Sequence, residues 1–179
     1  LMMIDLDNFK QISDFNGHSA GDTVLQGCAR RIEALLPSGA ILARLGGDEF
    51  AAALRFNPRH PEIVDEIANG TVEALGTPFT ANEITVDTGG SVGVARSDLP
   101  RDTSDDAFED NDSVERNPPH DAVPVTGQTL MHMADIAMYH AKKQGRGRYF
   151  WFEASMESEL RFRGKLEKGI RQGIPRGEF

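Results

Sequence analysis

The sequence predicts one α/β or α+β domain in which a sheet is layered with helices. Short apolar segments of strand length alternate with segments whose apolar residues recur at helical spacing. The chain has 179 residues, of which 39% are apolar and 26% charged, and this suits a single folded core. Its longest apolar run is far shorter than the ~18 residues that span a bilayer, so we expect no membrane contact.

The N-terminal part of the chain begins with a strand signal and continues with two helix signals. Residues 1–5 form an apolar run that ends in an aspartate, which is typical of a buried strand. Apolar residues at helical spacing predict helices over residues 7–16 and 19–36. Gly17 ends the first of these helices, and a Pro-Ser-Gly sequence at 37–39 ends the second.

The middle of the chain predicts a hairpin, a helix and further strands. Residues 41–45 and 49–56 are expected to form two strands around the tight turn Gly46-Gly47-Asp48. Residues 61–75 carry a helical apolar stripe, and residues 79–95 have strand character with a Gly-Gly interruption.

The C-terminal part contains an acidic segment followed by helix, strand and helix signals. Residues 97–126 are polar and contain four prolines, so we expect a flexible surface insertion. Nine acids against two arginines within this segment account for most of the net charge of −9. Residues 127–144 predict a helix, 149–152 a strand and 155–172 an amphipathic helix. No face is broadly basic, so we expect no nucleic-acid partner.

Carboxylates are placed where two strand signals end. Asp5 closes the first strand, and Asp48 and Glu49 follow the paired glycines of the hairpin turn. If these strands are neighbours, the acids converge at one edge of the sheet and offer the oxygen ligands that Mg²⁺ prefers. The structural alternative is an ordinary hairpin turn with solvated acids.

Basic residues cluster at the end of the predicted helix over 127–144. They are Lys142, Lys143, Arg146 and Arg148. One interpretation is that they complement the helix dipole. The functional interpretation is a clamp for a polyphosphate, in which lysine supplies a point charge and arginine a fork of donors. Acids for a metal together with bases for phosphate are the usual division of labour in phosphoryl transfer.

Five motifs in register resemble the GGDEF family, the diguanylate cyclases. The first is Arg44-Leu45-Gly46-Gly47-Asp48-Glu49-Phe50, which contains the family's signature. The others are Ile4-Asp5-Leu6-Asp7-Asn8-Phe9-Lys10, Gly17-His18-Ser19-Ala20-Gly21-Asp22, Ser91-Val92-Gly93-Val94-Ala95 and the segment from Ala134 to Arg146. Apart from the acidic segment, they cover residues 1–150.

The resemblance implies an α+β sandwich similar to the palm domains of nucleotide cyclases and polymerases. Its central sheet is mainly antiparallel and is flanked by helices. The implied reaction is the condensation of two GTP molecules into cyclic di-GMP with release of pyrophosphate. One GTP would bind to each protomer, so the resemblance implies a homodimer for catalysis. We expect this chemistry in the cytoplasm, and the single cysteine, Cys28, is consistent with a reducing compartment.

The resemblance also implies the metal and catalytic residues. Asp5, Asp48 and the carbonyl of Leu6 fall where the family binds Mg²⁺ or Mn²⁺. Glu49 falls where the family aids metal binding or removes the proton of the 3′-hydroxyl. Catalysis is therefore expected to depend on Glu49 and Asp48.

Further positions match the family's contacts to the nucleotide. The amides near Phe9 and Lys10 and the side chains of Lys142 and Arg146 match its phosphate contacts. Gly47 matches the position whose backbone lies under the nucleotide. Asp22 matches the carboxylate that accepts hydrogen bonds from the guanine edge. Ser13 stands at the neighbouring guanine position, where the family usually has asparagine, and its shorter side chain is expected to weaken guanine binding.

The chain departs from the family's pattern at two other places. The family's product-inhibition motif, Arg-x-x-Asp, is replaced here by Pro37-Ser38-Gly39-Ala40, so we expect no inhibitory site there. The family also has a helix and a turn ahead of its first strand, which match no part of this chain. We therefore expect the chain to be an excised part of a longer protein.

The domain organisation expected from the sequence is a GGDEF domain over residues 1–152 and a helix over 153–179. The second segment resembles the connection between GGDEF and EAL phosphodiesterase domains, and its alternative is a basic amphipathic C-terminal helix. Three functional hypotheses follow. They are an active cyclase, a catalytically weak GTP-binding domain that regulates an attached EAL domain, and a structural dimerising module.

Overall fold

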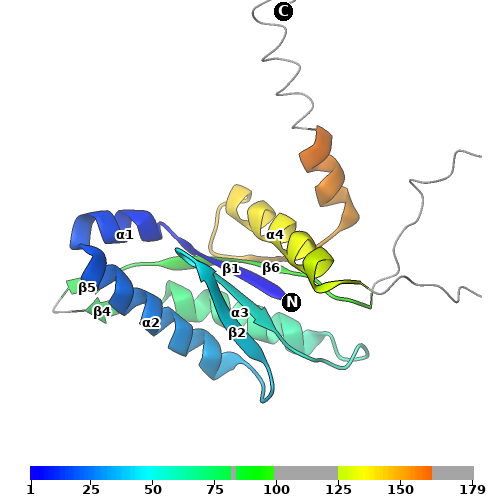
Figure 1. The fold of residues 1–179 in the computed structure, drawn as a ribbon, viewed down its shortest axis with the longest axis horizontal. Coiled ribbons are helices and arrows are strands. Elements are labelled where there is room, and N and C mark those ends of the chain that lie inside the picture. The colour runs from blue at the N-terminus through cyan, green and yellow to red at the C-terminus, as the bar shows by residue number, and fades with distance from the viewer. Residues whose placement is uncertain (82–83, 99–124, 163–179) are drawn as a thin grey trace, which may run out of the picture.

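The protein folds as a five-stranded sheet with helices on both of its faces (Figure 1). The computed structural model describes residues 1–81, 84–98 and 125–162. The strands of the main sheet are β1 (Met2–Asp7), β2 (Ile41–Gly46), β3 (Glu49–Ala53), β6 (Gly89–Val94) and β7 (Tyr149–Trp151). A separate hairpin consists of β4 (Phe79–Ala81) and β5 (Ile84–Val86). The helices are α1 (Phe9–Asn16), α2 (His18–Leu35), α3 (Glu62–Gly76) and α4 (Gly127–Lys143), and residues 154–162 are also helical.

The sheet has the order β2-β3-β1-β6-β7 and is mainly antiparallel. Strand β1 pairs antiparallel with both β3 and β6, and β2 pairs antiparallel with β3. Only β6 and β7, among the described pairs, run parallel. This arrangement confirms the expected α+β fold with a mainly antiparallel central sheet.

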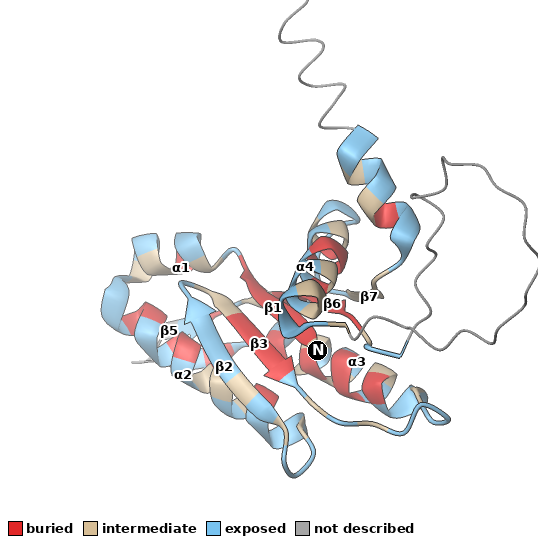
Figure 2. Ribbon diagram, turned by 45° about the vertical axis from the view of Figure 1, so that its right-hand side comes forward, coloured by how far each residue is buried: buried red, intermediate tan, exposed pale blue. Residues whose placement is uncertain are grey.

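Strand β1 is buried along its whole length and places alternate residues on opposite faces (Figure 2). Met2, Ile4 and Leu6 belong to the larger core cluster, together with buried residues of α2 and α3. Met3 packs instead with residues of α4. By the strand period, Asp5 and Asp7 lie on the same face as Met3, the face that α4 covers.

Helix α4 approaches strand β6 very closely at Gly93. A Cβ atom at Gly93 would lie 2.0 Å from the carbonyl oxygen of Ala134 and 2.2 Å from the amide nitrogen of Met138. Only glycine leaves room for the backbone of α4 at this distance. The close approach fixes where the C-terminal end of α4 lies relative to β1.

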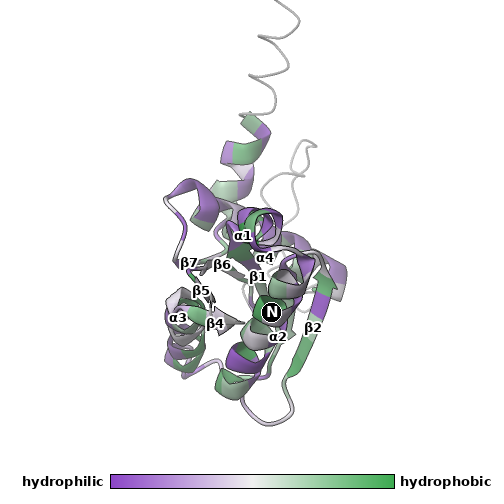
Figure 3. Cartoon of the chain, turned by 90° about the vertical axis from the view of Figure 1, so that its left-hand side faces the viewer, coloured by the Kyte–Doolittle hydropathy of each residue, from purple (hydrophilic) through white to green (hydrophobic). Residues whose placement is uncertain are grey.

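The two edges of the sheet differ in character. Strand β2 is an outer strand with a mostly apolar sequence (Figure 3), and it leaves Ile41 and Leu45 exposed. Strand β7, at the other edge, is tied to α3 by a carboxylate. Asp65 accepts hydrogen bonds from the hydroxyl of Tyr149 (3.1 Å) and the indole of Trp151 (2.6 Å).

Several element boundaries differ from the expectation. Asp7 ends β1 and does not begin a helix, because Asn8 adopts a left-handed φ of +62° and α1 starts only after it. Strand β3 ends at Ala53, short of the expected residue 56. The segment 79–95 contains three strands, of which only β6 joins the main sheet.

The acidic segment expected over 97–126 lies, except for its ends, outside the described residues, and so does the tail beyond residue 162. Within the described ranges, no helix has the length and apolar character needed to cross a membrane.

Candidate active site

Two carboxylates are neighbours where β1 and β3 pair, and a third belongs to the adjoining turn. Asp5 is the direct cross-strand partner of Glu49, so the two side chains leave the same face of the sheet with Cβ atoms about 5 Å apart. Asp48 belongs to the turn before β3. Its carbonyl accepts a hydrogen bond of 3.2 Å from the amide of Leu6 and thereby joins the turn to β1. The structure thus brings together the acids that the sequence predicted to converge.

The turn between β2 and β3 is held in one shape by its own sequence. Gly47 has a φ of +52°, a left-handed conformation that glycine adopts without steric cost. The guanidinium of Arg44 donates from Nε (3.0 Å) and Nη2 (2.7 Å) to the carbonyl of Gly47. Arg44 stands in the signature motif, but its position in the sequence alone predicts no role for it. The structure shows that it stabilises the turn that carries Asp48.

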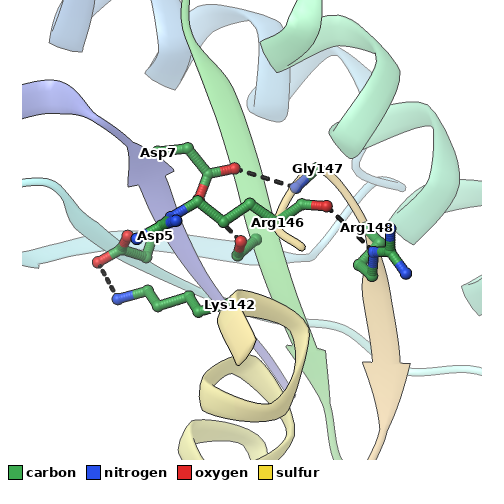
Figure 4. A network of polar contacts seen from close by, with 7 residues as sticks. Asp5, Asp7, Lys142, Arg146, Gly147 and Arg148 are labelled. Atoms are coloured by element: carbon green, nitrogen blue, oxygen red, sulfur yellow. Dashed lines mark hydrogen bonds and ion pairs between the residues drawn. The ribbon is translucent and has the colours of Figure 1, made fainter. Parts of the chain in front are cut away.

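Two of the four basic residues at or just after the end of α4 face acids of β1, and Figure 4 shows how they lie. The Nζ atom of Lys142 is 2.7 Å from Oδ2 of Asp5. The Nε atom of Arg146 is 3.8 Å from Oδ1 of Asp7. Lys143, in contrast, lies over the ring of Tyr139, with its Nζ 5.3 Å from the ring centroid.

The remaining basic residue, Arg148, serves the local turn. Its Nε donates a hydrogen bond of 3.1 Å to the carbonyl of Arg146. The basic cluster therefore divides into a pair directed at the acids of β1 and two residues with local contacts. That division matches the two residues, Lys142 and Arg146, that the sequence selected for phosphate.

Burial governs the electrostatics of Asp5. Only 8% of this residue is exposed. Its burial raises the pKa of the Asp5 carboxyl above the ordinary value, while the hydrogen bond and charge of Lys142 lower it. The negative charges of Asp48 and Glu49 raise it further. Asp5 is thus a carboxylate whose ionised form depends on a nearby cation.

A metal ion with oxygen ligands fits this group of residues. Asp5 already has a cationic partner in the ammonium of Lys142, and the carboxylate of Glu49 stands beside it. Leu6 offers only its backbone, since its side chain is 1% exposed within the core. Within residues 1–81, 84–98 and 125–162, no three acidic, histidine or cysteine side chains are close enough together to form a metal cluster by themselves. A metal ion held by Asp5 and Glu49 would need further oxygen ligands to complete its coordination sphere.

Only one residue separates helix α1 from β1, so its first-turn amides follow directly on the strand that carries Asp5. Asn8, with its left-handed φ of +62°, turns the backbone from strand into helix. The carbonyl of Asn8 accepts from the amides of Gln11 (3.0 Å) and Ile12 (3.3 Å). The amides of Phe9 and Lys10 belong to the first turn, whose N–H groups have no acceptor within the helix.

The expected guanine residues lie where α1 packs against α2. A Cβ atom at Gly21 would lie 3.3 Å from Oγ of Ser13, so Ser13 contacts the residue directly before Asp22. The hydroxyl of Ser13 also lies 3.2 Å from Nδ1 of His18. Asp22 itself is exposed on α2. Helix packing thus places Ser13 against Gly21, the residue before Asp22, and His18 is a further neighbour of Ser13.

The turn from α2 to β2 carries no charged side chain. It consists of Pro37, Ser38, Gly39 and Ala40, with the amide of Ala40 donating to the carbonyl of Pro37 (3.0 Å). Gly39 has a φ of +82°. The turn has neither the arginine nor the aspartate of the product-inhibition motif.

Fold and site together define a class of protein. A mainly antiparallel sheet carries acids on its central strand, and a lysine and an arginine from the end of one helix face them. These are the features of the palm-like α+β domains of nucleotide cyclases.

Family comparison identifies the group within this class. The model of the family described as "Diguanylate cyclase, GGDEF domain" matches residues 1–116. The chain belongs to the GGDEF domain family of diguanylate cyclases.

Individual relatives agree with this family. An uncharacterized signaling protein of Caulobacter vibrioides is 34% identical over the whole chain, and the chain covers 19% of its length. MucR of Pseudomonas aeruginosa, a bifunctional diguanylate cyclase/cyclic di-GMP phosphodiesterase, is 33% identical over the whole chain, which covers 22% of it. The chain therefore spans about a fifth of the length of these two relatives.

A solved structure shows the same fold. The GGDEF domain of TpbB from Pseudomonas aeruginosa superposes with a TM-score of 0.70 and is 34% identical in sequence. The match covers 89% of this chain and 80% of that domain.

Proposed function

We propose that this domain condenses two molecules of GTP into cyclic di-GMP and pyrophosphate. The observation that carries the proposal is the ion pair of 2.7 Å between Asp5 and Lys142. It joins the acids on the central strands to the basic end of α4, so that one short distance spans the metal-binding and phosphate-binding parts of the site. The family membership supports the same reaction.

The triphosphate would lie between α1 and the end of α4. Lys142 and Arg146 supply positive charge. The guanidinium of Arg146 can also donate two parallel hydrogen bonds to phosphate oxygens. The first-turn amides of α1, at Phe9 and Lys10, donate to the same anion. Gly47 allows the nucleotide to approach the backbone of the turn.

The guanine base would be read by Asp22 with Ser13. A carboxylate accepts from N1–H and the exocyclic amine of guanine, an arrangement of donors that adenine lacks. A polar group left without its partner discriminates strongly against the wrong base.

Mg²⁺ or Mn²⁺ would be held by Asp5, Asp48, Glu49 and the carbonyl of Leu6. When bound, such an ion polarises the phosphate that is attacked and neutralises the charge that develops on the leaving group. Glu49 is placed beside Asp5 to take the proton of the attacking 3′-hydroxyl. In each half of the reaction, a bond forms between the 3′-oxygen and the α-phosphorus, and the bond from that phosphorus to pyrophosphate breaks.

A homodimer would supply both nucleotides. Each protomer binds one GTP, and two protomers face each other so that each 3′-hydroxyl reaches the α-phosphate in the other site. The protein is proposed to contain a phosphodiesterase domain as well, as the bifunctional relative MucR suggests. The resemblance of residues 153–179 to the connection between GGDEF and EAL domains favours the EAL type.

The second candidate function is a GTP-binding regulatory domain with weak turnover. Ser13 favours it, because a hydroxyl replaces the expected asparagine and already lies within hydrogen-bond distance of His18. In this case GTP would bind and would change the activity of an attached domain.

Product analysis tests both candidates. The purified chain is incubated at high concentration with GTP and Mg²⁺, and the products are separated by chromatography. The cyclase predicts cyclic di-GMP, lost by at least ~100-fold in Asp48→Ala and Lys142→Ala. Lys143→Ala is the matched control, since its ammonium lies over Tyr139, away from the acids. Calorimetric GTP binding without product would favour the regulatory function.

A further inference from the structure

Asp7 is a buried acid for which the proposed reaction has no direct use. It ends β1, two residues after Asp5, and only 5% of it is exposed. Its Oδ1 accepts a hydrogen bond of 2.8 Å from the hydroxyl of Ser91. Its Oδ2 accepts one of 3.1 Å from the amide of Gly147 (Figure 4). A buried charge needs such partners, so this carboxylate is held in a built site.

The neighbouring strand leaves space for the carboxylate of Asp7. Gly89 in β6 is its direct cross-strand partner. A Cβ atom at Gly89 would lie 3.0 Å from Oδ2 of Asp7 and 3.5 Å from its Cβ, which is closer to the carboxylate than a side chain comfortably packs. Ser91, which is fully buried, donates its hydrogen bond to the other oxygen, Oδ1. The sheet is thus shaped to place the Asp7 carboxylate beneath the turn that follows α4.

Arg146, in that turn, has an unusual backbone. Its φ of +61° is left-handed, a conformation that residues other than glycine rarely adopt because it costs free energy. Its amide donates to the carbonyl of Ala141 (3.1 Å), and its carbonyl accepts from Nε of Arg148 (3.1 Å). The next amide, that of Gly147, donates to Asp7. The peptide that follows Arg146 is therefore fixed at both of its polar groups.

Asp7 also acts on the Arg146 side chain. The Nε atom of Arg146 lies 3.8 Å from Oδ1 of Asp7, and the side chain is 57% exposed. The guanidinium thus lies beside a buried carboxylate at ion-pair distance, while more than half of the Arg146 side chain is exposed. This geometry leaves the fork free to meet a phosphate.

We infer that Asp7 is a positioning residue for the triphosphate of GTP. By binding the amide of Gly147 and attracting the guanidinium of Arg146, it holds Arg146 in the strained conformation that presents its side chain to the phosphates. The inference rests on the proposed function, since it names Arg146 as a phosphate contact. We expect the loss of Asp7 to raise the dissociation constant of GTP on the order of tenfold or more. The rate at saturating GTP should change by a smaller factor.

Two substitutions at Asp7 separate the hydrogen bonds from the charge. In Asp7→Asn the amide oxygen still accepts from Gly147 and the amide nitrogen donates to Ser91, so only the charge is lost. Asp7→Ala loses both. We expect the dissociation constant of GTP, measured by calorimetry on the full chain, to rise in the order wild type, Asp7→Asn, Asp7→Ala.

A double-mutant cycle with Arg146→Ala identifies the route of the effect. If Asp7 acts through Arg146, Asp7→Ala adds little to the weakened binding of Arg146→Ala. An equal loss of affinity in both backgrounds would overturn the inference and leave only a structural role. Asp65→Asn is the matched control. It changes another acid that accepts two hydrogen bonds, from Tyr149 and Trp151 and not from Gly147, and leaves the affinity for GTP unchanged.

Amide hydrogen exchange in the nucleotide-free protein supplies a second readout. Exchange at Gly147 is expected to be faster in Asp7→Ala than in wild type, while amides of β3 keep their protection. Unchanged exchange at Gly147 would contradict the positioning role. Failure of the wild-type chain to bind GTP would overturn the proposed function, whereas normal GTP binding that is insensitive to Asp7→Ala would overturn this inference alone.

Discussion

Asp5 owes its properties to opposing effects on one carboxyl group. Burial raises its pKa, and the charge of Lys142 lowers it again. The same residue is the cross-strand partner of Glu49 and forms an ion pair with Lys142. A group of this kind responds measurably when a single partner is removed.

The first prediction at this scale concerns the pKa of Asp5. Replacing Lys142 by Met removes the nearest positive charge, so the pKa of Asp5 rises further above its ordinary value. Carboxyl chemical shifts followed through a pH titration measure this change. A pKa that stays constant or falls would show that Lys142 does not stabilise the ionised form.

The second prediction concerns stability. A carboxyl whose pKa is raised in the folded protein adds stability at pH below its ordinary pKa, and that contribution is lost as the pH rises through the folded value. At neutral pH the ionised Asp5 is therefore a cost. We expect Asp5→Asn to unfold at a higher temperature than wild type at pH 7, although product formation is lost.

Asp65→Asn is the control for that experiment. Its carboxylate accepts hydrogen bonds from Tyr149 and Trp151, and the substitution weakens both. It should lower the unfolding temperature at the same pH. A lower unfolding temperature in Asp5→Asn as well would mean that the ion pair with Lys142 outweighs the burial of the charge.

Sequence reasoning found the acids of the site and missed Asp7. The apolar run predicted a strand that closes at Asp5, and Asp48 and Glu49 follow paired glycines, so local patterns point to them. In the structure β1 continues to Asp7, because the pairing with β6 extends to that residue. The partners of Asp7 are Ser91 and Gly147, which are 84 and 140 positions away in the sequence. No spacing rule connects such residues, because only the sheet and the end of α4 bring them together.

At the scale of elements, the contact between α4 and β6 decides where the cations lie. Lys142 reaches Asp5 because the backbone of α4 approaches the sheet at Gly93 without an intervening side chain. Glycine in a strand often marks such a close approach. The sequence around Gly93 predicts a strand, but only the tertiary structure shows that α4 packs against the strand at this glycine.

The third prediction tests this contact. Gly93→Ala forces α4 away from the sheet, since its Cβ would lie 2.0 Å from the carbonyl oxygen of Ala134. The expected loss of unfolding free energy is about 1–3 kcal/mol, measured by denaturant titration, together with a fall in product formation. Gly76→Ala is the control, because nothing lies within 4 Å of a Cβ atom there and its φ is not left-handed. Equal stability of the two variants would show that α4 does not need this close approach.

The order of helices and strands could be predicted well from periodicity, and their pairing could not. The apolar stripes predicted α2, α3 and α4 within a few residues of their observed ends. The sequence of residues 79–95 has strand character with only a Gly-Gly interruption. In the structure β4 and β5 pair only with each other, and β6 belongs to the main sheet. The parallel pairing of β7 with β6 is likewise set by packing against α3 and α4.

At the scale of the whole molecule, one domain offers one set of phosphate contacts, and the proposed product contains two nucleotides. The fourth prediction is therefore that the rate of product formation per protein molecule rises with protein concentration until the dimer is complete. Initial rates over a concentration series, compared with sedimentation velocity, measure this dependence. The affinity for GTP should stay constant over the same series, and a constant specific activity would contradict catalysis between protomers.

The ion pair between Asp5 and Lys142 has a thermodynamic consequence. A single ammonium group cannot fully neutralise Asp5 and a phosphate at the same time, so each bound phosphate competes for the counter-ion that Asp5 uses in the free protein. A divalent cation that neutralises Asp5 releases Lys142 for the nucleotide, and a nucleotide that engages Lys142 releases Asp5 for the cation. By linkage, each ligand raises the affinity of the domain for the other by the same factor. The free domain would thus bind each ligand more weakly than the domain that already holds the other ligand.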